Sequence, residues 1–327
     1  MKSVYLHGIG DVRLHQEDRP QPQNGELLLR VTAVGICGSD IHWFAEGTTG
    51  AAGFSKPFIL GHEFAAVVES GKMEGQRVAV EPHVACGGCQ YCLEGSPNLC
   101  PYHYFAGQAP QDGALRQYMC WPEDYVFPIP NSISDEGGAL LEPLGVAIHT
   151  VDLGNLRPGM RVGVYGCGPI GLMVVQLARL SGAVEIVATD RLAHRLEAAK
   201  QMGATAVFAA DDASSDMPEV DVAFEVAGDQ GAVDTAVETC KPGGRVVICG
   251  IPSDDRTSFK ASTARRKELT IIVVRRMKHT YHRAIDLVSG GLIDVDSLVS
   301  HRFSLDDGAE AFKVAEAREG LKVVVKP

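Results

Sequence analysis

The sequence contains no uninterrupted apolar run of the roughly 20 residues that a membrane-spanning helix needs. It also has no excess of positive charge, because 41 Asp and Glu residues outnumber 30 Lys and Arg residues and give a formal net charge of -11. Nucleic-acid binding relies on basic surface to displace counterions, so this charge argues against a general nucleic-acid partner. The first residues hold no apolar stretch that resembles a signal peptide. These absences favour a cytoplasmic protein that binds neither a membrane nor nucleic acid.

Cysteine is also scarce, since nine residues in a chain of 327 are too few for a disulfide scaffold. Four of the nine, Cys86, Cys89, Cys92 and Cys100, lie within fifteen residues, which indicates reduced thiols that bind a metal. Four thiolates in a short loop can close a tetrahedral site around zinc and leave no position open for chemistry. Pro101 follows the last cysteine as in a ferredoxin iron–sulfur run, but that run has three residues before its fourth cysteine and this loop has seven. We therefore predict a structural zinc site.

The length of the chain exceeds the size at which a single core usually stops growing, so two domains are expected. The first part, up to about Glu142, has short alternating segments broken by Gly and Pro. It is predicted to form strands at 27–31, 65–69 and 77–80. From about Gly145 strands alternate with helices, as in a parallel sheet that is covered on both faces. This pattern ends near Arg276. The predicted strands are 161–165, 185–189, 221–226 and 245–249, and the predicted helices are 169–180 and a charged helix that ends at 202.

The last part of the chain returns to a β pattern, with Phe303 and the apolar run 323–325. We therefore predict an α/β protein in which a doubly wound parallel-sheet domain, residues 145–276, is inserted into a mostly β domain made of residues 1–144 and 277–327.

A glycine turn follows the first strand of the inserted domain and opens a helix. It reads Gly166-Cys167-Gly168-Pro169-Ile170-Gly171, a G-x-G-x-x-G. The glycines permit a tight turn and let a pyrophosphate approach the N-terminus of the helix, so the context favours a dinucleotide site over a turn without a ligand.

The choice between the two nicotinamide dinucleotides depends on the end of the second strand. Asp190 stands 24 residues after Gly166, where a carboxylate can accept hydrogen bonds from a ribose 2′-OH. A 2′-phosphate would meet this negative charge, so NAD is predicted over NADP. Arg191 and Arg195 are close enough in sequence to neutralise a phosphate, which keeps NADP as the alternative.

A second group of metal-ligand residues is scattered along the chain: Cys37, His62, Glu63 and Glu142. A thiolate, an imidazole and a carboxylate can hold a catalytic zinc with a position left for water or substrate. From the residues alone this set is only suggestive, because a single Cys or His is more often a buried structural residue.

Together these motifs resemble the zinc-containing medium-chain dehydrogenase superfamily, and within it the polyol branch typified by sorbitol (L-iditol) dehydrogenase. The resemblance covers essentially the whole chain and rests on motifs in the expected order. They are Gly35 to His42, Gly61-His62-Glu63, the four-cysteine loop, Glu142-Pro143-Leu144 and the Gly166 turn. The resemblance implies a Rossmann domain inserted into a GroES-like catalytic domain, two zinc ions per chain, and a homo-oligomer, either a tetramer or a dimer.

The resemblance also implies roles for the scattered residues. Cys37, His62 and Glu63 would sit at the catalytic zinc, and Glu142 would bind it directly or through its water. Members of the superfamily differ over which of the two glutamates touches the metal, so both remain open. Asp40 would orient the liganding imidazole.

A proton must leave the alcohol when it is oxidised, and the resemblance gives it a route through Ser39 and His42 to solvent. The alternative roles for these two residues are helix capping and surface packing.

Substrate contacts are implied at Arg276 and Trp43, although the sequence departs from the polyol branch at both places. Met277 follows Arg276 where that branch has Tyr, and Trp43 stands where it usually has Tyr. Arg276 could equally form a surface or interface salt bridge. The resemblance implies oxidation of a secondary hydroxyl of a polyol such as sorbitol, xylitol or L-iditol to a ketose. The alternatives are a threonine, 2,3-butanediol or aldonate (L-idonate) dehydrogenase, and a non-catalytic dinucleotide-binding protein.

Overall fold

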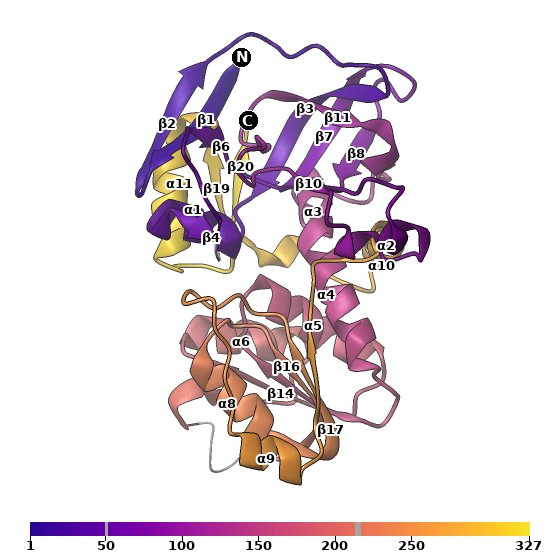
Figure 1. Cartoon of the computed structure of the whole chain (residues 1–327), viewed down its shortest axis with the longest axis vertical. Helices are drawn as coiled ribbons and strands as arrows, with labels where there is room; N and C mark the ends of the chain where they lie inside the picture. Colours follow the sequence, from indigo (N-terminus) through magenta and orange to yellow (C-terminus); the bar gives the residue numbers. More distant parts are fainter. Residues whose placement is uncertain (50–51, 213–216) are drawn as a thin grey trace. The chain divides into compact units, whose positions relative to one another are not determined.

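The computed structural model of the chain describes residues 1–49, 52–212 and 217–327. The chain divides into two compact units (Figure 1). The first unit comprises Met1–Pro143 and Tyr281–Pro327, and the second comprises Leu144–Thr280. Among the described residues, no helix combines the length and apolar character needed to cross a membrane.

The first unit is built on a seven-stranded sheet in which six strands have the order β12-β8-β7-β3-β20-β19 and β11 pairs with β3. All neighbours are antiparallel except β19 and β20. The strands predicted in the first part of the chain are confirmed as β3, β7 and β8, and the C-terminal β prediction as β19 and β20. The strands are β3 (Glu26–Gly35), β7 (Glu63–Ser70), β8 (Arg77–Val80), β11 (Tyr118–Pro122), β12 (Val126–Pro128), β19 (Val299–Ser304) and β20 (Lys322–Lys326).

Smaller elements complete this unit. One sheet has the order β2-β1-β6, and two short pairs join β9 with β10 and β4 with β5. The strands are β1 (Lys2–Gly8), β2 (Asp11–Gln16), β4 (Thr48–Thr49), β5 (Ala52–Gly53), β6 (Phe58–Ile59), β9 (His83–Val84) and β10 (Tyr104–Phe105). The helices are α1 (Gly38–Glu46), α2 (Gln90–Leu93), α3 (Asp135–Ala139), α10 (Tyr281–Ser289) and α11 (Gly308–Glu316), with short 3-10 turns at Pro97–Leu99, Glu123–Tyr125, Asp296–Leu298 and Leu305–Asp307.

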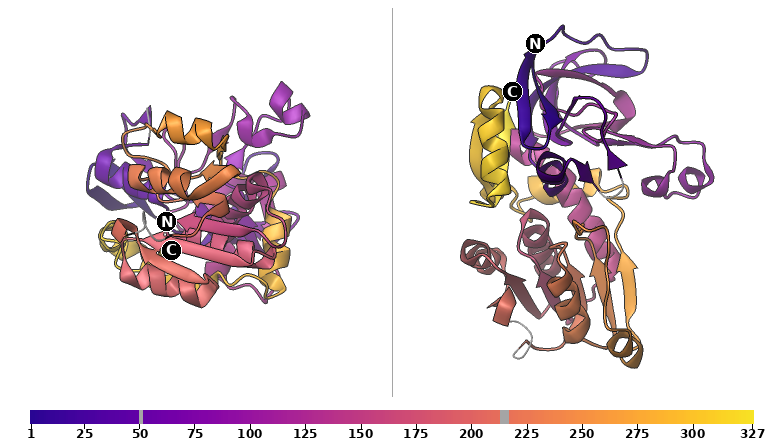
Figure 2. Two further views of the ribbon diagram at one scale, coloured as in Figure 1. Left: turned by 90° about the horizontal axis from the view of Figure 1, so that it is seen from below. Right: turned by 60° about the vertical axis from the view of Figure 1, so that its left-hand side comes forward.

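The second unit holds a six-stranded sheet of order β15-β14-β13-β16-β17-β18, in which every pair of neighbours is parallel. Its strands are β13 (Arg161–Tyr165), β14 (Glu185–Asp190), β15 (Ala206–Ala209), β16 (Val220–Glu225), β17 (Cys240–Ile248) and β18 (Thr270–Val273). Helices lie on both faces, with α8 on one face and α5 and α6 on the other (Figure 2). The helices are α5 (Pro169–Leu180), α6 (Ala193–Met202), α8 (Gln230–Thr239) and α9 (Ala261–Arg266); α4 (Leu141–Gly154) begins in the first unit, and a 3-10 turn spans Ala210–Asp212.

The predicted doubly wound sheet is therefore confirmed. Three of its strands, β13, β14 and β16, lie within one residue of where the sequence placed them, because each is a short apolar run that is buried on both faces. One strand differs in length. β17 begins at Cys240 rather than at Arg245, since the Lys-Pro-Gly-Gly segment between them continues the extended chain through a shift in register against β16.

Candidate metal centres and dinucleotide site

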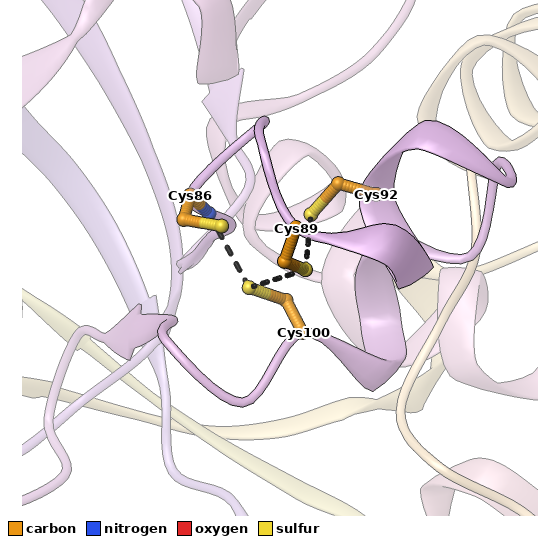
Figure 3. Close-up of side chains that lie close together, drawn as sticks. All are labelled: Cys86, Cys89, Cys92 and Cys100. Atoms are coloured by element: carbon orange, nitrogen blue, oxygen red, sulfur yellow. Dashed lines mark hydrogen bonds between the residues drawn. The ribbon is translucent and has the colours of Figure 1, made fainter.

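The four cysteines of the short loop come together in the first unit. Cys89 and Cys92 lie at the two ends of α2, and Cys86 and Cys100 flank it (Figure 3). Cys89 Sγ lies 3.5 Å from Cys92 Sγ and 3.8 Å from Cys100 Sγ. All four sulfur atoms lie within 4.8 Å of one another.

These distances fit a metal site and not a disulfide. Sulfur atoms at the corners of a zinc tetrahedron with 2.3 Å bonds are about 3.8 Å apart, whereas a disulfide bond is about 2.05 Å long. Hydrogen bonds, the largest from the backbone amide of Gly88, lower the pKa of Cys86 to about 7 and favour its thiolate, whereas burial raises the pKa of Cys92 to about 12. The four residues therefore match the donor set of a closed zinc site.

The second predicted group also assembles in part. Cys37, His62 and Glu63 each offer a ligand atom, and these atoms lie within 4.8 Å of one another. Cys37 is the residue before α1, and the other two residues lie where the chain enters β7, so two separate segments supply the group. Glu142 is buried in the first turn of α4 but lies outside this group.

Asp40 holds these two segments together. One of its carboxylate oxygens accepts a hydrogen bond from the backbone amide of Cys37 at 3.0 Å, and the other accepts one from Gly61 at 3.2 Å. That second oxygen also lies 3.4 Å from Nδ1 of His62. The other ring nitrogen, Nε2, lies 3.4 Å from Ser39 Oγ. Asp40 thus faces the Nδ1 edge of the imidazole and leaves Nε2 on the side of Ser39, as expected of the carboxylate behind a metal-binding histidine.

The electrostatics of this group suit a cation. Burial alone would lower the pKa of His62, but the nearby charges of Asp40 and Cys37 outweigh burial and raise it. A site that stabilises a buried imidazolium attracts positive charge of other kinds as well. Zinc would take the place of the proton on Nε2, and a thiolate, an imidazole and a carboxylate are ligands that zinc accepts.

Lys322 is a member of this neighbourhood that the sequence analysis missed. Its side chain is 3% exposed and forms an ion pair with Glu63, whose side chain is 1% exposed. Lys322 Nζ also donates a hydrogen bond to the carbonyl oxygen of Ile36 at 3.0 Å. The room for this pair depends on Gly35, because a Cβ at that position would collide with the Glu63 carboxylate. The only signal in the sequence was a lysine beside the apolar run 323–325.

Tyr281 was missed as well. It is fully buried at the start of α10, and its hydroxyl donates to the carbonyl oxygen of Val80 at 2.6 Å. Burial raises the pKa of Tyr281, and the carboxylates of Glu142, Glu81 and Glu63 raise it further. The negative charges of all three glutamates are therefore felt at the hydroxyl of Tyr281, so Glu142 and Glu63 both lie in the neighbourhood of this tyrosine.

The other predicted site residues of this unit take up different environments. Ser39 and His42 are three residues apart on α1 and so lie on the same face of the helix. Glu46, one turn further on, lies 3.0 Å from Nδ1 of His42 and orients its ring. Trp43 is only 2% exposed and packs edge-on against Phe58 in the hydrophobic core.

The glycine turn of the second unit shows which of its glycines the protein itself requires. Gly166 has a φ of +108°, a conformation that side chains disfavour. A Cβ on Gly171 would overlap the carbonyl oxygen of Gly166. A Cβ on Gly168 would meet only Arg195 Nη1, at 3.6 Å.

The packing of the chain therefore leaves space above Gly168, at the N-terminus of α5, where Pro169 and Ile170 form the first turn. The second glycine of such a turn is the one that lets a pyrophosphate approach, so the turn fits a dinucleotide.

Asp190 ends β14 beside this turn. Its two carboxylate oxygens accept hydrogen bonds from the backbone amides of Cys167 at 2.8 Å and Leu192 at 2.9 Å. These bonds fix the carboxylate at the carboxyl ends of the strands, where doubly wound sheets bind their ligands.

Glu225 is a buried residue at the end of β16 that the sequence analysis also missed. Its carboxylate accepts hydrogen bonds from the amides of Ala227 at 2.8 Å and Gly228 at 2.7 Å. Glu225 and Gly228 line a cavity of about 210 Å³ at the ends of β16 and β17, together with Gly250. The signal in the sequence was an acidic residue inside an apolar strand. Arg276 belongs to the second unit, and its predicted contact with substrate stays a prediction.

Two family models, curated relatives and solved structures match the chain. The family model for zinc-binding dehydrogenases matches residues 169–290, and the model for the alcohol dehydrogenase GroES-like domain matches residues 23–131. The chain is 39% identical to a sorbitol dehydrogenase of Bacillus subtilis, with 100% of this chain and 97% of that protein covered. It is 36% identical to a probable D-xylulose reductase A of Aspergillus clavatus, with 99% and 96% covered. Its fold matches L-idonate 5-dehydrogenase of Escherichia coli with a TM-score of 0.93, at 30% identity and with 100% and 98% covered.

Proposed function

The chain belongs to the zinc-dependent medium-chain dehydrogenase superfamily, and from that premise we propose that it oxidises a secondary hydroxyl of an acyclic polyol to a ketose, with NAD as the hydride acceptor. The observation that carries this proposal is the buried group of Cys37, His62 and Glu63. A purely structural protein would not need these zinc ligands in a chain that also carries a dinucleotide turn. The relatives named for sorbitol and xylulose support the polyol class.

Two bound groups supply the reaction's chemistry. When bound, zinc would supply Lewis acidity at the substrate oxygen, and a nicotinamide dinucleotide would supply the hydride acceptor. In our proposal Cys37, His62 and a glutamate, either Glu63 or Glu142, hold the catalytic zinc. Cys86, Cys89, Cys92 and Cys100 hold the structural zinc.

The chain's own residues bind and orient these groups. Asp40 fixes the ring of His62 through contacts to both metal-binding segments. In our proposal Asp190 accepts hydrogen bonds from the ribose hydroxyls of NAD, and the pyrophosphate binds at the Gly166–Gly171 turn. A hydroxyl buried beside His62 needs a route for its proton, and Ser39 and His42 supply it in our proposal because they share one face of α1. Glu46 supports this role, since its bond to Nδ1 of His42 leaves Nε2 free for the transfer.

Arg276 and Trp43 remain the proposed substrate contacts. Arg276 offers several donors that could bind neighbouring hydroxyls. The burial of the Trp43 ring in the core gives less support to a direct contact with substrate. A homo-oligomer, tetramer or dimer, and a cytoplasmic location also remain predictions; light scattering of the purified protein would test the first.

The substrate class is tested by steady-state kinetics on a panel of alcohols. The zinc-loaded enzyme should oxidise sorbitol, xylitol or L-iditol with NAD at a higher kcat/KM than 2-propanol, because remote hydroxyls help to orient the reacting carbon. Arg276→Ala should lower polyol turnover far more than turnover of 2-propanol.

Two other substrate classes belong in the same panel. If threonine, 2,3-butanediol or L-idonate is oxidised briskly and the three polyols are ignored, the polyol assignment is wrong. The aldonate alternative is included because the structure resembles L-idonate 5-dehydrogenase. The family assignment would survive that result.

A further inference from the structure

An ion pair crosses the edge of the parallel sheet at the dinucleotide turn. Arg191 Nη2 lies 3.0 Å from Asp229 Oδ2. Arg191 directly follows β14, and Asp229 lies in the loop after β16. These strands flank β13, whose carboxyl end opens into the Gly166–Gly171 turn. Because the three strands are parallel, the pair joins the loops on the two sides of that turn.

The Asp229 carboxylate is held in place from a second direction. Its other oxygen, Oδ1, accepts a hydrogen bond from the backbone amide of Gly231 at 2.9 Å and so caps the N-terminus of α8. One oxygen is therefore used by the helix, and the other is directed at the guanidinium of Arg191. The ion pair is a single charge-assisted hydrogen bond between exposed side chains, 61% for Arg191 and 39% for Asp229, and it is fixed at the aspartate end by the helix cap.

The local charges bear on the choice of cofactor. NAD and NADP differ by a 2′-phosphate, which carries two negative charges or nearly so at neutral pH. Asp190 lies next to Arg191 in the chain, and Asp229 adds a second carboxylate on the other side of the turn. Arg191 and Arg195 are the arginines near this turn that could offset a phosphate, and the guanidinium of Arg191 is paired with Asp229.

We propose that Asp229 is a positioning residue for cofactor choice, which disfavours NADP by keeping Arg191 paired with a carboxylate and unavailable to a 2′-phosphate. This inference rests on the proposed preference for NAD. It adds a determinant that lies 39 residues away from Asp190 in sequence and acts through the adjacent arginine.

The test uses Asp229→Asn in the full-length, zinc-loaded protein. Asparagine is as good a helix N-cap as aspartate, so the thermal midpoint should stay close to that of the wild type. Dissociation constants are measured by calorimetry for NAD and NADP. Adenosine 2′,5′-bisphosphate and ADP are measured as well, because they report on the adenosine end alone. The NADP-to-NAD affinity ratio should rise about fivefold to tenfold, since a freed guanidinium can form charge-assisted hydrogen bonds with a phosphate.

Two further variants show whether Asp229 acts through Arg191. Asp234→Asn removes the same charge from an exposed position on the same helix and should change the ratio by less than about twofold, because an exposed charge is strongly screened by water and salt. Arg191→Ala combined with Asp229→Asn should abolish the gain. In kinetics, the change should appear in the KM for the cofactor and not in kcat.

The outcomes separate the two proposals. A wild-type protein that binds NADP more tightly than NAD would overturn the proposed cofactor, whatever the variants do. If the wild type prefers NAD but Asp229→Asn leaves the ratio unchanged, or changes it no more than Asp234→Asn does, the role of Asp229 is refuted. A gain that persists without Arg191 would show direct repulsion by the carboxylate and would refute positioning through the arginine.

Discussion

At the scale of single residues, the buried pair of Lys322 and Glu63 explains how an acidic group is tolerated beside a predicted metal centre. Taking two charges out of water is costly, and mutual attraction offsets that cost only when the pairing is close. Burial alone would lower the pKa of Lys322, but the charge of Glu63 outweighs it and raises the pKa. The lysine therefore stays charged, and it compensates one of the carboxylates of the region.

Removal of this lysine should be strongly destabilising. Lys322→Met leaves an uncompensated buried carboxylate, so we expect a loss of about 3–5 kcal/mol in the free energy of unfolding. Lys326→Met is a matched control in the same strand, because that lysine is exposed and pairs with Glu136 at the surface. The control should lose less than about 1 kcal/mol. Urea titration gives the free energy of unfolding of the two variants. Equal losses would show that the buried pair stabilises the fold no more than the surface pair does.

At the scale of secondary-structure elements, the glycine turn contains one glycine that packing requires, Gly171, and one that only a bound ligand would require, Gly168. Gly171→Ala places a methyl group on the backbone of Gly166, so we expect a loss of about 1–3 kcal/mol in stability. Gly168→Ala meets only a flexible arginine end and should cost less than about 1 kcal/mol. It should nevertheless weaken NAD binding by about tenfold or more, because its methyl group intrudes where the pyrophosphate approaches.

Thermal unfolding and calorimetric titration with NAD test these expectations together. A Gly168→Ala variant that binds NAD as tightly as the wild type would show that the turn does not receive the pyrophosphate. A Gly171→Ala variant of unchanged stability would show that the turn relaxes more easily than its geometry indicates.

Another element-level contact predicts how stability depends on pH. Glu136 on α3 accepts two hydrogen bonds from Arg302 of β19, both at 2.9 Å, and Lys326 of β20 lies 3.4 Å away. Arg302 is the main cause that lowers the pKa of Glu136 in the folded protein. A carboxyl group with a lowered folded pKa stabilises the fold above its unfolded pKa of about 4.5, and this contribution is lost as the pH falls through the folded pKa.

Glu136→Gln should therefore cost about 1 kcal/mol at pH 7, and the difference from wild type should shrink as the pH falls below about 4.5. Urea unfolding measured from pH 3 to pH 7 gives this difference directly. Glu316→Gln, at an exposed position on α11, is the control and should show little difference at any pH. A Glu136→Gln difference that stays constant over this range would contradict the assignment.

The elements that sequence reasoning found are those specified by local patterns. The parallel strands are short apolar runs, the Gly166 turn is six residues long, and the four-cysteine loop spans fifteen residues. The contacts that it missed join distant segments. Lys322 reaches the carbonyl oxygen of Ile36 across 286 residues of sequence, and no local pattern marks that approach. The substrate contact at Trp43, which the family resemblance implied, stays a prediction, and its ring packs in the core.

At the scale of the whole molecule, the first unit carries both groups of metal-ligand residues and the second carries the dinucleotide turn. The two metal groups differ in composition. The four-thiol group is closed on itself, whereas the group of Cys37, His62 and Glu63 has three donors and so leaves room for a further ligand. Stability and activity should therefore depend on different cysteines of the same unit.

The final prediction follows from this division. The purified protein should contain two zinc ions per chain, and Cys37→Ala should lower this to one while reducing turnover by about a thousandfold or more, because the Lewis acid is lost. Its unfolding midpoint should change little. Cys89→Ala should also lose one zinc, but with several kcal/mol of stability, since binding energy at a closed site is folding energy. Cys120→Ala removes a thiol outside both groups and should keep both ions. Zinc analysis with thermal unfolding and sorbitol turnover distinguishes the three variants, and a wild-type protein with one zinc or none would refute the assignment of two sites.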